Sequence, residues 1–205
     1  MGLFSFFSKI FGKPGLPDSI DFIFFGLGNP GSRYAQTRHN IGFRVVDGLA
    51  ERLSEKKQGS FEKADWVYGK IDSRNVLIVK PLTFMNRSGI AVKDLINQSK
   101  VNLTTTMVVV DDFNIPLGTL RARRGGSHGG HNGLKSITSA IGPDFPRLRF
   151  GIGPLPEGAD IIDFVLGDFS DQEEITLADE IPRAVEALNF FIKEGIDPLM
   201  NKYNK

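Results

Sequence analysis

The sequence predicts one α/β domain, a twisted, mixed and mostly parallel sheet with helices on both faces. Apolar runs of strand length alternate with segments whose apolar residues recur at helical spacing, the order expected when helices connect parallel strands. The 205 residues are 40% hydrophobic, which is enough for one well-buried domain and short for two. Because no internal repeat interrupts this order, we assign residues 21–205 to a single domain.

Residues 1–20 form an N-terminal extension ahead of this domain. Its apolar side chains would share one face of a short helix, which a run of Gly and Pro ends. That face consists of Leu3, Phe4, Phe7, Ile10 and Phe11. The extension is expected to pack on the domain or stay mobile, and an amphipathic helix on a membrane surface is the alternative. It does not fit a secretory signal, because Lys9 interrupts the apolar region.

Three strands and two helices are predicted in the first half of the domain. In order they are a strand over 21–26 ("DFIFFG"), a helix over 41–53, strands over 66–71 and 75–80, and a helix over about 88–98. Only the three residues "DSR" separate the second and third strands, so these two are expected to form a hairpin.

Two strands and two helices follow in the second half. In order they are a strand over 106–110 ("TMVVV"), a helix over 132–142, a strand over 147–152 and a helix over about 171–193. The first of these strands is expected to stop at Asp111. The last helix should begin at a capping box formed by Ser170 and Glu173, and Pro182 near its middle predicts a kink.

The composition excludes several classes of function. Lys and Arg number 25 against 24 Asp and Glu, so no global field draws the chain to nucleic acid, and any basic footprint is local. Without cysteine there is no disulfide, thiolate metal site or cysteine nucleophile, which suits a reducing compartment. No stretch approaches the roughly 20 apolar residues of a transmembrane helix. We therefore expect a cytoplasmic protein without a stable membrane span.

Polar residues stand just past the predicted strands and at the starts of helices. They are Asn29, Asn86 and Asp111 after strands, and His39, His131 and Asn132 at helix starts. Ligands of open α/β sheets bind outside the carboxyl ends of the strands. These six residues are therefore expected to converge on one crevice.

"GLGNPG" (26–31) spells the glycine pattern of a dinucleotide-binding loop. Such a loop runs straight into a helix whose N-terminus holds the pyrophosphate. Here nine residues, "SRYAQTRHN", intervene before the helical pattern starts. Asp47 has the spacing of a ribose-binding acid, but it lies within the predicted helix. The context therefore argues against a dinucleotide site.

Two further motifs leave alternatives open. "GGSHG" (125–129) spells the nucleophile elbow of serine hydrolases, with Ser127 as nucleophile and His39 as its base, although a flexible Gly-Ser loop explains the same letters. A metal site could draw on four or five side chains, but no spacing such as H-E-x-x-H supports it. Its candidate ligands are His39, His128 and His131 with Asp111 or Asp112.

The converging residues suit the hydrolysis of a carbonyl compound better. A histidine can take a proton from water, an aspartate can hold its imidazole in one tautomer, and asparagine amides can stabilise the developing oxyanion. His39 is expected to stay neutral and basic, because the dipole at a helix N-terminus disfavours imidazolium.

A local basic segment indicates the kind of substrate. No acidic residue occurs between Phe113 and Pro143, whereas this span contains Arg121, Arg123, Arg124 and Lys135. A basic patch beside a hydrolytic site suits a nucleic-acid backbone, and a solvated charged rim is the alternative.

Five blocks of the sequence resemble, in order, the bacterial-type peptidyl-tRNA hydrolases. They are "GLGNPGSRYAQTRHNIG" (26–42), "KPLTFMNRSG" (80–89), "VVVDDFNIPLG" (108–118), "GGHNGLKSI" (129–137) and "RLRFGIG" (147–153). The resemblance covers the chain from about residue 21 to its end. It implies hydrolysis of the ester between a peptide and the terminal ribose of tRNA, which recycles tRNA from aborted translation.

The resemblance also implies roles for individual residues. The catalytic residues would be His39 as general base, Asp111 as its orienting partner, and Asn29. The peptide, the water and the tetrahedral intermediate would be positioned by Asn29, Asn86 and Asn132, with Tyr34 and Met85 shaping the crevice. Arg123 and Arg149 would clamp the tRNA 5′-phosphate, and His131 and Lys135 would stabilise the site or line its rim. The chain departs from the family pattern in having Arg123 for a frequent Lys and Asn114 for a frequent acidic residue.

The implied partner is peptidyl-tRNA, held through its acceptor end, its 5′-phosphate and the nascent peptide. The resemblance implies a monomer without metal or cofactor. A non-catalytic RNA-binding relative and a serine esterase are the alternatives, and the presence of both His39 and Asp111 favours the enzyme over the RNA-binding relative.

Overall fold

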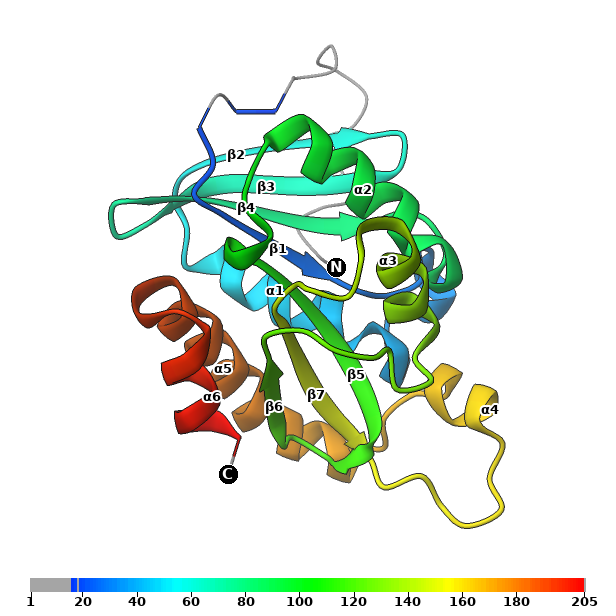
Figure 1. Cartoon of the computed structure of the whole chain (residues 1–205). Coiled ribbons are helices and arrows are strands. Elements are labelled where there is room, and N and C mark those ends of the chain that lie inside the picture. Colours follow the sequence, from blue (N-terminus) through cyan, green and yellow to red (C-terminus); the bar gives the residue numbers. More distant parts are fainter. Residues whose placement is uncertain (1–15, 18, 205) are drawn as a thin grey trace.

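A seven-stranded sheet forms the centre of the computed structural model, which describes residues 16, 17 and 19–204 (Figure 1). Across the sheet the strands follow the order β2-β3-β4-β1-β5-β7-β6. In chain order they are β1 (Phe22–Gly26), β2 (Ser54–Phe61), β3 (Ala64–Ile71), β4 (Arg74–Pro81), β5 (Thr106–Pro116), β6 (Leu120–Arg123) and β7 (Arg147–Gly153).

Parallel pairing is confined to the centre of the sheet. β1 pairs in parallel with β4 and β5, and β5 pairs in parallel with β7. Towards the edges, β3 pairs antiparallel with β2 and β4, and β6 pairs antiparallel with β7. The predicted fold class of one mixed α/β sheet is confirmed, and the predicted hairpin is β3 and β4.

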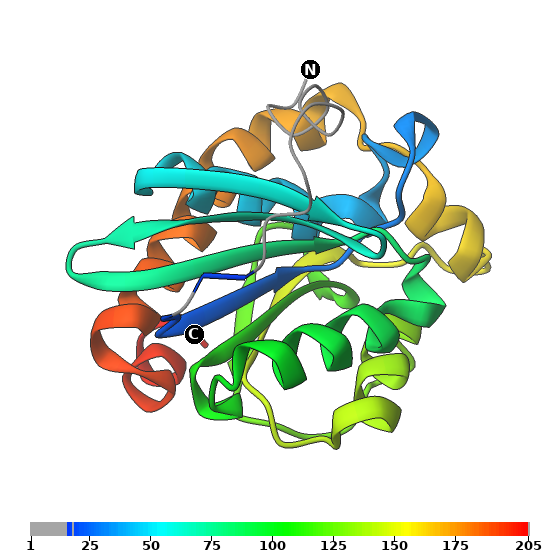
Figure 2. The same ribbon diagram turned by 90° about the horizontal axis from the view of Figure 1, so that it is seen from above.

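Helices cover both faces of this sheet. They are α1 (Ile41–Glu51), α2 (Ser88–Ser99), α3 (Asn132–Ile141), α4 (Ile161–Leu166), α5 (Asp171–Glu194) and α6 (Ile196–Tyr203). Helices α1, α5 and α6 lie on one face, while α2 and α3 lie on the other (Figure 1, Figure 2). Among the described residues, none of the helices is both long and apolar enough to cross a bilayer.

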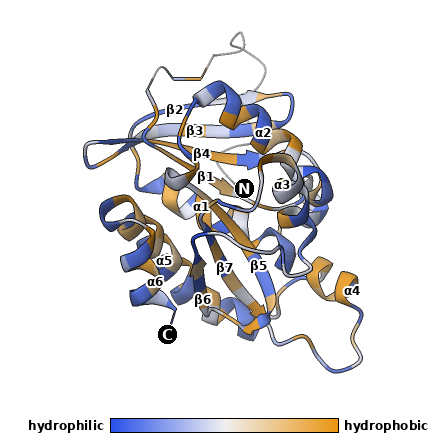
Figure 3. Ribbon diagram, viewed as in Figure 1, coloured by the Kyte–Doolittle hydropathy of each residue, from blue (hydrophilic) through white to orange (hydrophobic). Residues whose placement is uncertain are grey.

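Each face of the sheet has its own hydrophobic core. In β1, Phe24 points towards α1 and α5, whereas Ile23 and Phe25 point towards α2 and α3, because successive strand side chains alternate. All three are fully buried, and each stabilises the fold by about 1.5–3 kcal/mol. Figure 3 shows the apolar residues concentrated on the central strands, with further apolar colouring on α4. The side chains of β1 thus contribute to both hydrophobic cores.

Several elements differ from the sequence prediction. β2 was missed because its sequence, "SEKKQGSF", is polar and mostly exposed at the edge of the sheet. β6 and the short helices α4 and α6 were also missed. β5 does not stop at Asp111 but runs on to Pro116, since its backbone keeps pairing with β7 past that residue.

The last long helix begins as predicted. Ser170 and Glu173 form the capping box at the start of α5, and the helix continues past Pro182 to Glu194. The kink expected at Pro182 stays a prediction.

Most of the N-terminal extension, residues 1–15 and 18, lies outside the described residues. Its described end contacts the domain. Leu16 and Ile20 pack against the core between the sheet and α2 and α3, and the carbonyl of Ser19 accepts a hydrogen bond from Tyr68.

Candidate active site

The segment between β1 and α1 brings His39 to the carboxyl end of the sheet. His39 lies in a 3-10 turn, η2 (Arg38–Asn40), that leads directly into α1. The start of α1 touches the sheet because Gly42 has no side chain: a Cβ there would lie 2.5 Å from the carbonyl oxygen of Val109. This close approach of helix and strand sets His39 beside β5.

His39 and Asp111 are hydrogen-bonded to each other. Nδ1 of His39 lies 2.8 Å from Oδ1 of Asp111. An ionised carboxylate only accepts hydrogen bonds, so Nδ1 carries the proton and Nε2 is the basic nitrogen. Asp111 is 2% exposed and His39 is 8% exposed, so little water screens the pair.

His131 bonds to the same carboxylate oxygen. Its Nε2 lies 2.9 Å from Oδ1 of Asp111, and its Nδ1 accepts the backbone N–H of Leu134 at 3.2 Å as the N-cap of α3. These two contacts require the Nε2–H tautomer of a neutral ring. The sequence predicted His131 in the same crevice as Asp111 and among the candidate metal ligands, and the resemblance implied a stabilising or rim role. Its position at a helix start was the signal for a capping role, but spacing along the chain could not show that it shares one carboxylate oxygen with His39.

The carboxylate controls the electrostatics of this pair. Burial lowers the pKa of His39, but the Asp111 carboxylate outweighs burial, and the pKa of His39 is raised above its ordinary value. Burial acts to raise the pKa of Asp111, and His39 and His131 together hold it well below its usual range. The lowering of this pKa that the helix dipole predicts is therefore not the net result, because the Asp111 carboxylate 2.8 Å away raises it.

A network of amide groups fixes Asn29. Oδ1 of Asn40 accepts the backbone N–H of Asn29 at 2.7 Å, and Nδ2 of Asn40 donates to its carbonyl at 3.0 Å. Oδ1 of Asn29 accepts the backbone N–H of Met85 at 2.9 Å, so Nδ2 remains as the donor of the Asn29 side chain. The sequence analysis missed Asn40, although it directly follows His39 in "TRHN".

The remaining crevice residues come from η1 (Ser32–Tyr34), η3 (Met85–Arg87) and α3. Met85 is buried and packs against the start of α3, where a Cβ on Gly133 would lie 2.6 Å from its sulfur. Asn86 follows it at an exposed position of η3. The half-buried ring of Tyr34 meets the exposed ring of Phe84 edge-on, with centroids 6.5 Å apart.

Two predicted residues lie on the exposed side of α3. Asn132 is its first residue, directly after His131, and Lys135 lies one turn further along. The start of α3 therefore brings an amide and a positive charge to the side of the histidine pair.

Four arginines share one face of β6 and β7. In the antiparallel register Arg121 lies opposite Arg149 and Arg123 opposite Arg147, and opposite residues point to the same side. The other side of these strands belongs to the core with α5 and α6. We call this surface the arginine face (Arg121, Arg123, Arg147 and Arg149).

Arg147 is the buried member of the arginine face. It is 1% exposed, and its guanidinium donates at 2.5–3.4 Å to four backbone carbonyls, those of Gly126, Ser127, Pro143 and Phe145. Burial, with Arg149 nearby, lowers its pKa to about 10, which leaves it charged at neutral pH. The sequence could not distinguish Arg147 from Arg149, because the surroundings of Arg147 depend on how the loop with Gly126 and Ser127 packs against the turn before β7.

Arg149 and Arg123 are the two arginines that the sequence assigned to a phosphate. Nη1 of Arg149 bonds to Oδ2 of Asp112 at 2.9 Å, and Nη2 bonds to the carbonyl of Ser127 at 3.2 Å. Arg123 is exposed at the end of β6.

The local structure does not fit the serine-hydrolase or dinucleotide motifs. Ser127 lies in a loop, and α3 begins only at Asn132, so there is no sharp strand-to-helix turn at the serine. Only the three-residue 3-10 turn η1 directly follows "GLGNPG", since α1 begins at Ile41, and Asp47 in α1 bonds to Lys80. Neither motif has the context that its chemistry requires.

A metal at the histidine pair has an unfavourable ligand set. Ligand atoms of His39, Asp111 and His131 lie within 4.8 Å of one another. A metal bound at Nε2 of His131 would need a proton on Nδ1, but Nδ1 already accepts the N–H of Leu134. The contacts are those of a proton-transfer site.

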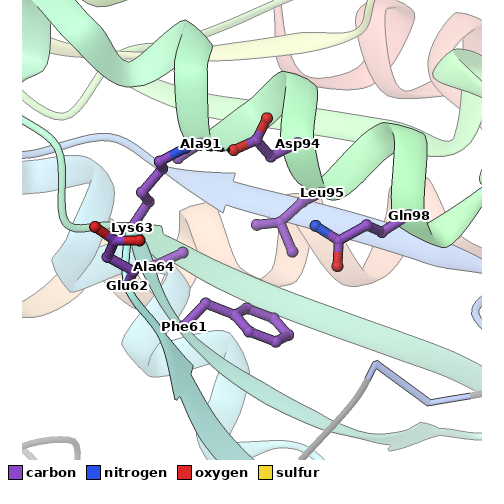
Figure 4. A pocket seen from close by; sticks show the side chains of 8 residues that line it. All are labelled: Phe61, Glu62, Lys63, Ala64, Ala91, Asp94, Leu95 and Gln98. Carbon is purple, nitrogen blue, oxygen red and sulfur yellow. Dashed lines mark hydrogen bonds and ion pairs between the residues drawn. The ribbon is translucent and has the colours of Figure 1, made fainter. Parts of the chain in front are cut away.

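A hollow of about 180 Å³ lies elsewhere, between α2 and the turn that joins β2 to β3 (Figure 4). Lys63 and Asp94 on its wall pair with each other at 2.8 Å. None of the described residues that line it bonds to His39, Asp111 or Asn29. We assign this hollow no part in the site.

Comparison with known proteins places this site in a family. The sequence matches the family described as peptidyl-tRNA hydrolase over residues 23–205. The peptidyl-tRNA hydrolase of Syntrophomonas wolfei is 48% identical over 180 residues, 87% of this chain and 97% of the relative. That of Elusimicrobium minutum is 45% identical over 181 residues, 88% of this chain and 97% of the relative. The crystal structure of peptidyl-tRNA hydrolase from Acinetobacter baumannii superposes with a TM-score of 0.83 at 33% identity, over 93% of this chain and 97% of that one. The chain belongs to the peptidyl-tRNA hydrolase family.

Proposed function

We propose that this chain hydrolyses the ester bond between the peptide and the tRNA of peptidyl-tRNA, and so recycles tRNA from aborted translation. Family membership supports the substrate, and the site geometry supports the mechanism. The observation that carries the mechanism is the 2.8 Å contact between Nδ1 of His39 and the buried carboxylate of Asp111.

His39 acts as the general base. Its Nδ1 proton is held by Asp111, so Nε2 takes a proton from the attacking water as the water oxygen bonds to the ester carbonyl carbon. The carboxylate of Asp111 stabilises the imidazolium that forms. When the tetrahedral intermediate collapses, the bond to the ribose oxygen breaks, and the proton on Nε2 passes to that oxygen.

Asparagine amides position the peptide and stabilise the oxyanion. The contact with Met85 leaves Nδ2 of Asn29 as a donor in a fixed place, and Asn86 and Asn132 supply further amides from η3 and α3. One preorganised donor to an oxyanion lowers the activation free energy of such reactions by about 3–4 kcal/mol. Tyr34 and Met85 shape the crevice. Asn side chains can bond to a peptide amide but not equally to a charged free amine, which spares aminoacyl-tRNA.

The arginine face receives the acceptor end of the tRNA. Arg123 and Arg149 bind the 5′-phosphate, Lys135 lines the rim of the site, and His131 stabilises the site through Asp111. Arginine in place of lysine at position 123 keeps the charge and offers a planar, bidentate contact to phosphate oxygens.

We further infer that residues 21–205 form one peptidyl-tRNA hydrolase domain and that the protein acts as a cytoplasmic monomer without metal or cofactor. The hydrogen-bond pattern at Asp111, to which both histidines donate a ring N–H, supports chemistry without a metal. Full activity after dialysis against EDTA is the expected result, and activity restored only by a divalent metal would contradict it.

Release of a labelled N-acetylaminoacyl group from tRNA tests the mechanism. His39→Ala is expected to lose about 10²–10⁴-fold in kcat, whereas Ser127→Ala keeps its activity. Circular dichroism of each variant controls for folding. No release by the parent would remove the proposal, and loss confined to Ser127→Ala would favour the serine esterase. Unchanged release by a folded His39→Ala variant would exclude His39 as the base.

A further inference from the structure

Asp112 is an acidic side chain among the positive charges of the arginine face. Successive side chains of β5 point to opposite sides of the sheet. Asp111 therefore reaches His39 on the α1 side, and Asp112 reaches Arg149 on the other. Two adjacent carboxylates thus have different partners, the two histidines for Asp111 and Arg149 for Asp112.

The contacts of Asp112 hold it in place. Oδ2 lies 2.9 Å from Nη1 of Arg149, while Oδ1 accepts the backbone N–H of Asn114 at 2.9 Å and its Nδ2 at 3.2 Å. Asp112 is only 8% exposed. A carboxylate with both oxygens bonded and little access to water cannot swing away when an anion arrives.

We propose that Asp112 sets the affinity of the tRNA site, because it is a fixed negative charge that competes with the 5′-phosphate for Arg149. This inference rests on the proposed function, in which Arg149 binds that phosphate. A phosphate at Arg149 must share the guanidinium with Asp112 or displace it, and in both cases it lies close to a like charge. Like charges several ångströms apart near a surface weaken binding by roughly tenfold or more.

Weaker binding at this position favours turnover. The 5′-phosphate is present on peptidyl-tRNA and on the deacylated tRNA that is released, and it takes no part in the reaction. Binding energy that is equal in substrate and product does not speed the chemical step, and it slows the release of product. Asp112 offsets part of the attraction of the four arginines and so limits retention of the product.

Direct binding of deacylated tRNA tests this inference without catalysis. Kd is measured for tRNA with a 5′-phosphate and for the same tRNA with a 5′-hydroxyl, using the parent, Asp112→Asn, Arg149→Gln and the double variant. Asparagine keeps the shape of Asp112 and an oxygen for Asn114 while it removes the charge. Asp94→Asn, which breaks the remote pair with Lys63 (Figure 4), controls for the loss of one negative charge.

Asp112→Asn is expected to lower Kd for the 5′-phosphate tRNA roughly tenfold and to change Kd for the 5′-hydroxyl tRNA far less. The double variant should lose this gain, and Asp94→Asn should bind both tRNAs like the parent. The slope of log Kd against log salt should also steepen by about one in Asp112→Asn.

Opposite results separate the inference from the function on which it rests. Equal or weaker binding of the 5′-phosphate tRNA by a folded Asp112→Asn variant would overturn the role of Asp112 alone. If Arg149→Gln kept the parent's preference for the 5′-phosphate, the phosphate would not be bound at Arg149, and both statements would fail. Hydrolysis of peptidyl-tRNA by the parent is scored separately, by release of the labelled group.

Discussion

The imidazole rings of His39 and His131 bond to the same oxygen of one carboxylate, Oδ1 of Asp111, and their centroids lie 5.1 Å apart. His39 precedes α1 on one face of the sheet, and His131 caps α3 on the other. One buried charge therefore orients two rings from opposite layers. Removing the carboxylate of Asp111 should lower the pKa of His39, and removing the ring of His131 should raise it.

Asp111→Asn should lower the pKa of His39, because the burial that lowers this pKa remains while the carboxylate that raises it is lost. Only the neutral ring can act as a base, so kcat/KM of the parent should rise with pH through a midpoint above 6.5, the ordinary pKa of histidine. The variant should be slower by about 10²–10⁴-fold, with a lower midpoint. A pH profile of kcat/KM measures both, and a midpoint equal to that of the parent would contradict the assignment.

His131→Asn should raise the midpoint of the same profile. Asp111 then has one partner instead of two, so its negative charge acts more strongly on His39. Asparagine is itself a good N-cap and can still accept the N–H of Leu134, so unfolding in urea should change by less than about 1 kcal/mol. His131→Ala is the matched control, which also loses the cap and should cost about 1 kcal/mol more. A midpoint that falls in His131→Asn would refute the shared-carboxylate account.

Asn40→Ala should lower both stability and kcat. The variant loses two hydrogen bonds and leaves the buried N–H of Asn29 without a partner, which costs about 2–4 kcal/mol in the free energy of unfolding. The Asn29 amide then loses its fixed position, so kcat should fall more than KM rises. Asn75→Ala, which also loses two side-chain hydrogen bonds, to Ser19 and from Tyr68, is the control and should change kcat little. Unchanged kcat in Asn40→Ala would show that Asn29 does not depend on Asn40.

Arg147→Met should destabilise the fold by about 2–4 kcal/mol, because it removes the hydrogen bonds that the buried guanidinium donates to the backbone carbonyls of Gly126, Ser127, Pro143 and Phe145. Arg121→Met, on the same face but exposed, is the control and should stay within about 0.5 kcal/mol of the parent. Urea unfolding followed by circular dichroism compares the two. Equal changes in the free energy of unfolding of the two variants would mean that the hydrogen bonds of Arg147 to the carbonyls do not stabilise the fold.

The apolar pattern of the sequence predicted the strands that build the core. β1 and the first half of β5, up to Val110, are apolar runs, and the start of α5 follows from Ser170 and Glu173. β2 could not be predicted in this way, since an exposed edge strand buries too little to leave an apolar pattern. It is held by backbone pairing with β3, which the side chains do not encode.

The candidate site also contains residues that the sequence predicted and contacts that it could not predict. The rule that ligands bind at strand ends selected His39, Asp111 and Asn29 from the sequence. It could not show that His131 shares the carboxylate, because that contact depends on how α3 packs and not on spacing along the chain. Arg147 and Arg149 are two residues apart in "RLR", yet one is buried among carbonyls and the other faces Asp112. Only tertiary packing separates them.

Both outer strands of the sheet are protected against pairing with another chain. The side chain of Asn204 bonds to the N–H and the carbonyl of Ala122 at 2.6 and 2.9 Å, where a further strand would otherwise add to β6. β2 shifts register between Ser54 and Lys57 and presents charged side chains to solvent. Irregular and charged edges are how soluble proteins avoid edge-to-edge aggregation. At both edges of the sheet a further strand would therefore meet backbone that is already bonded or irregular.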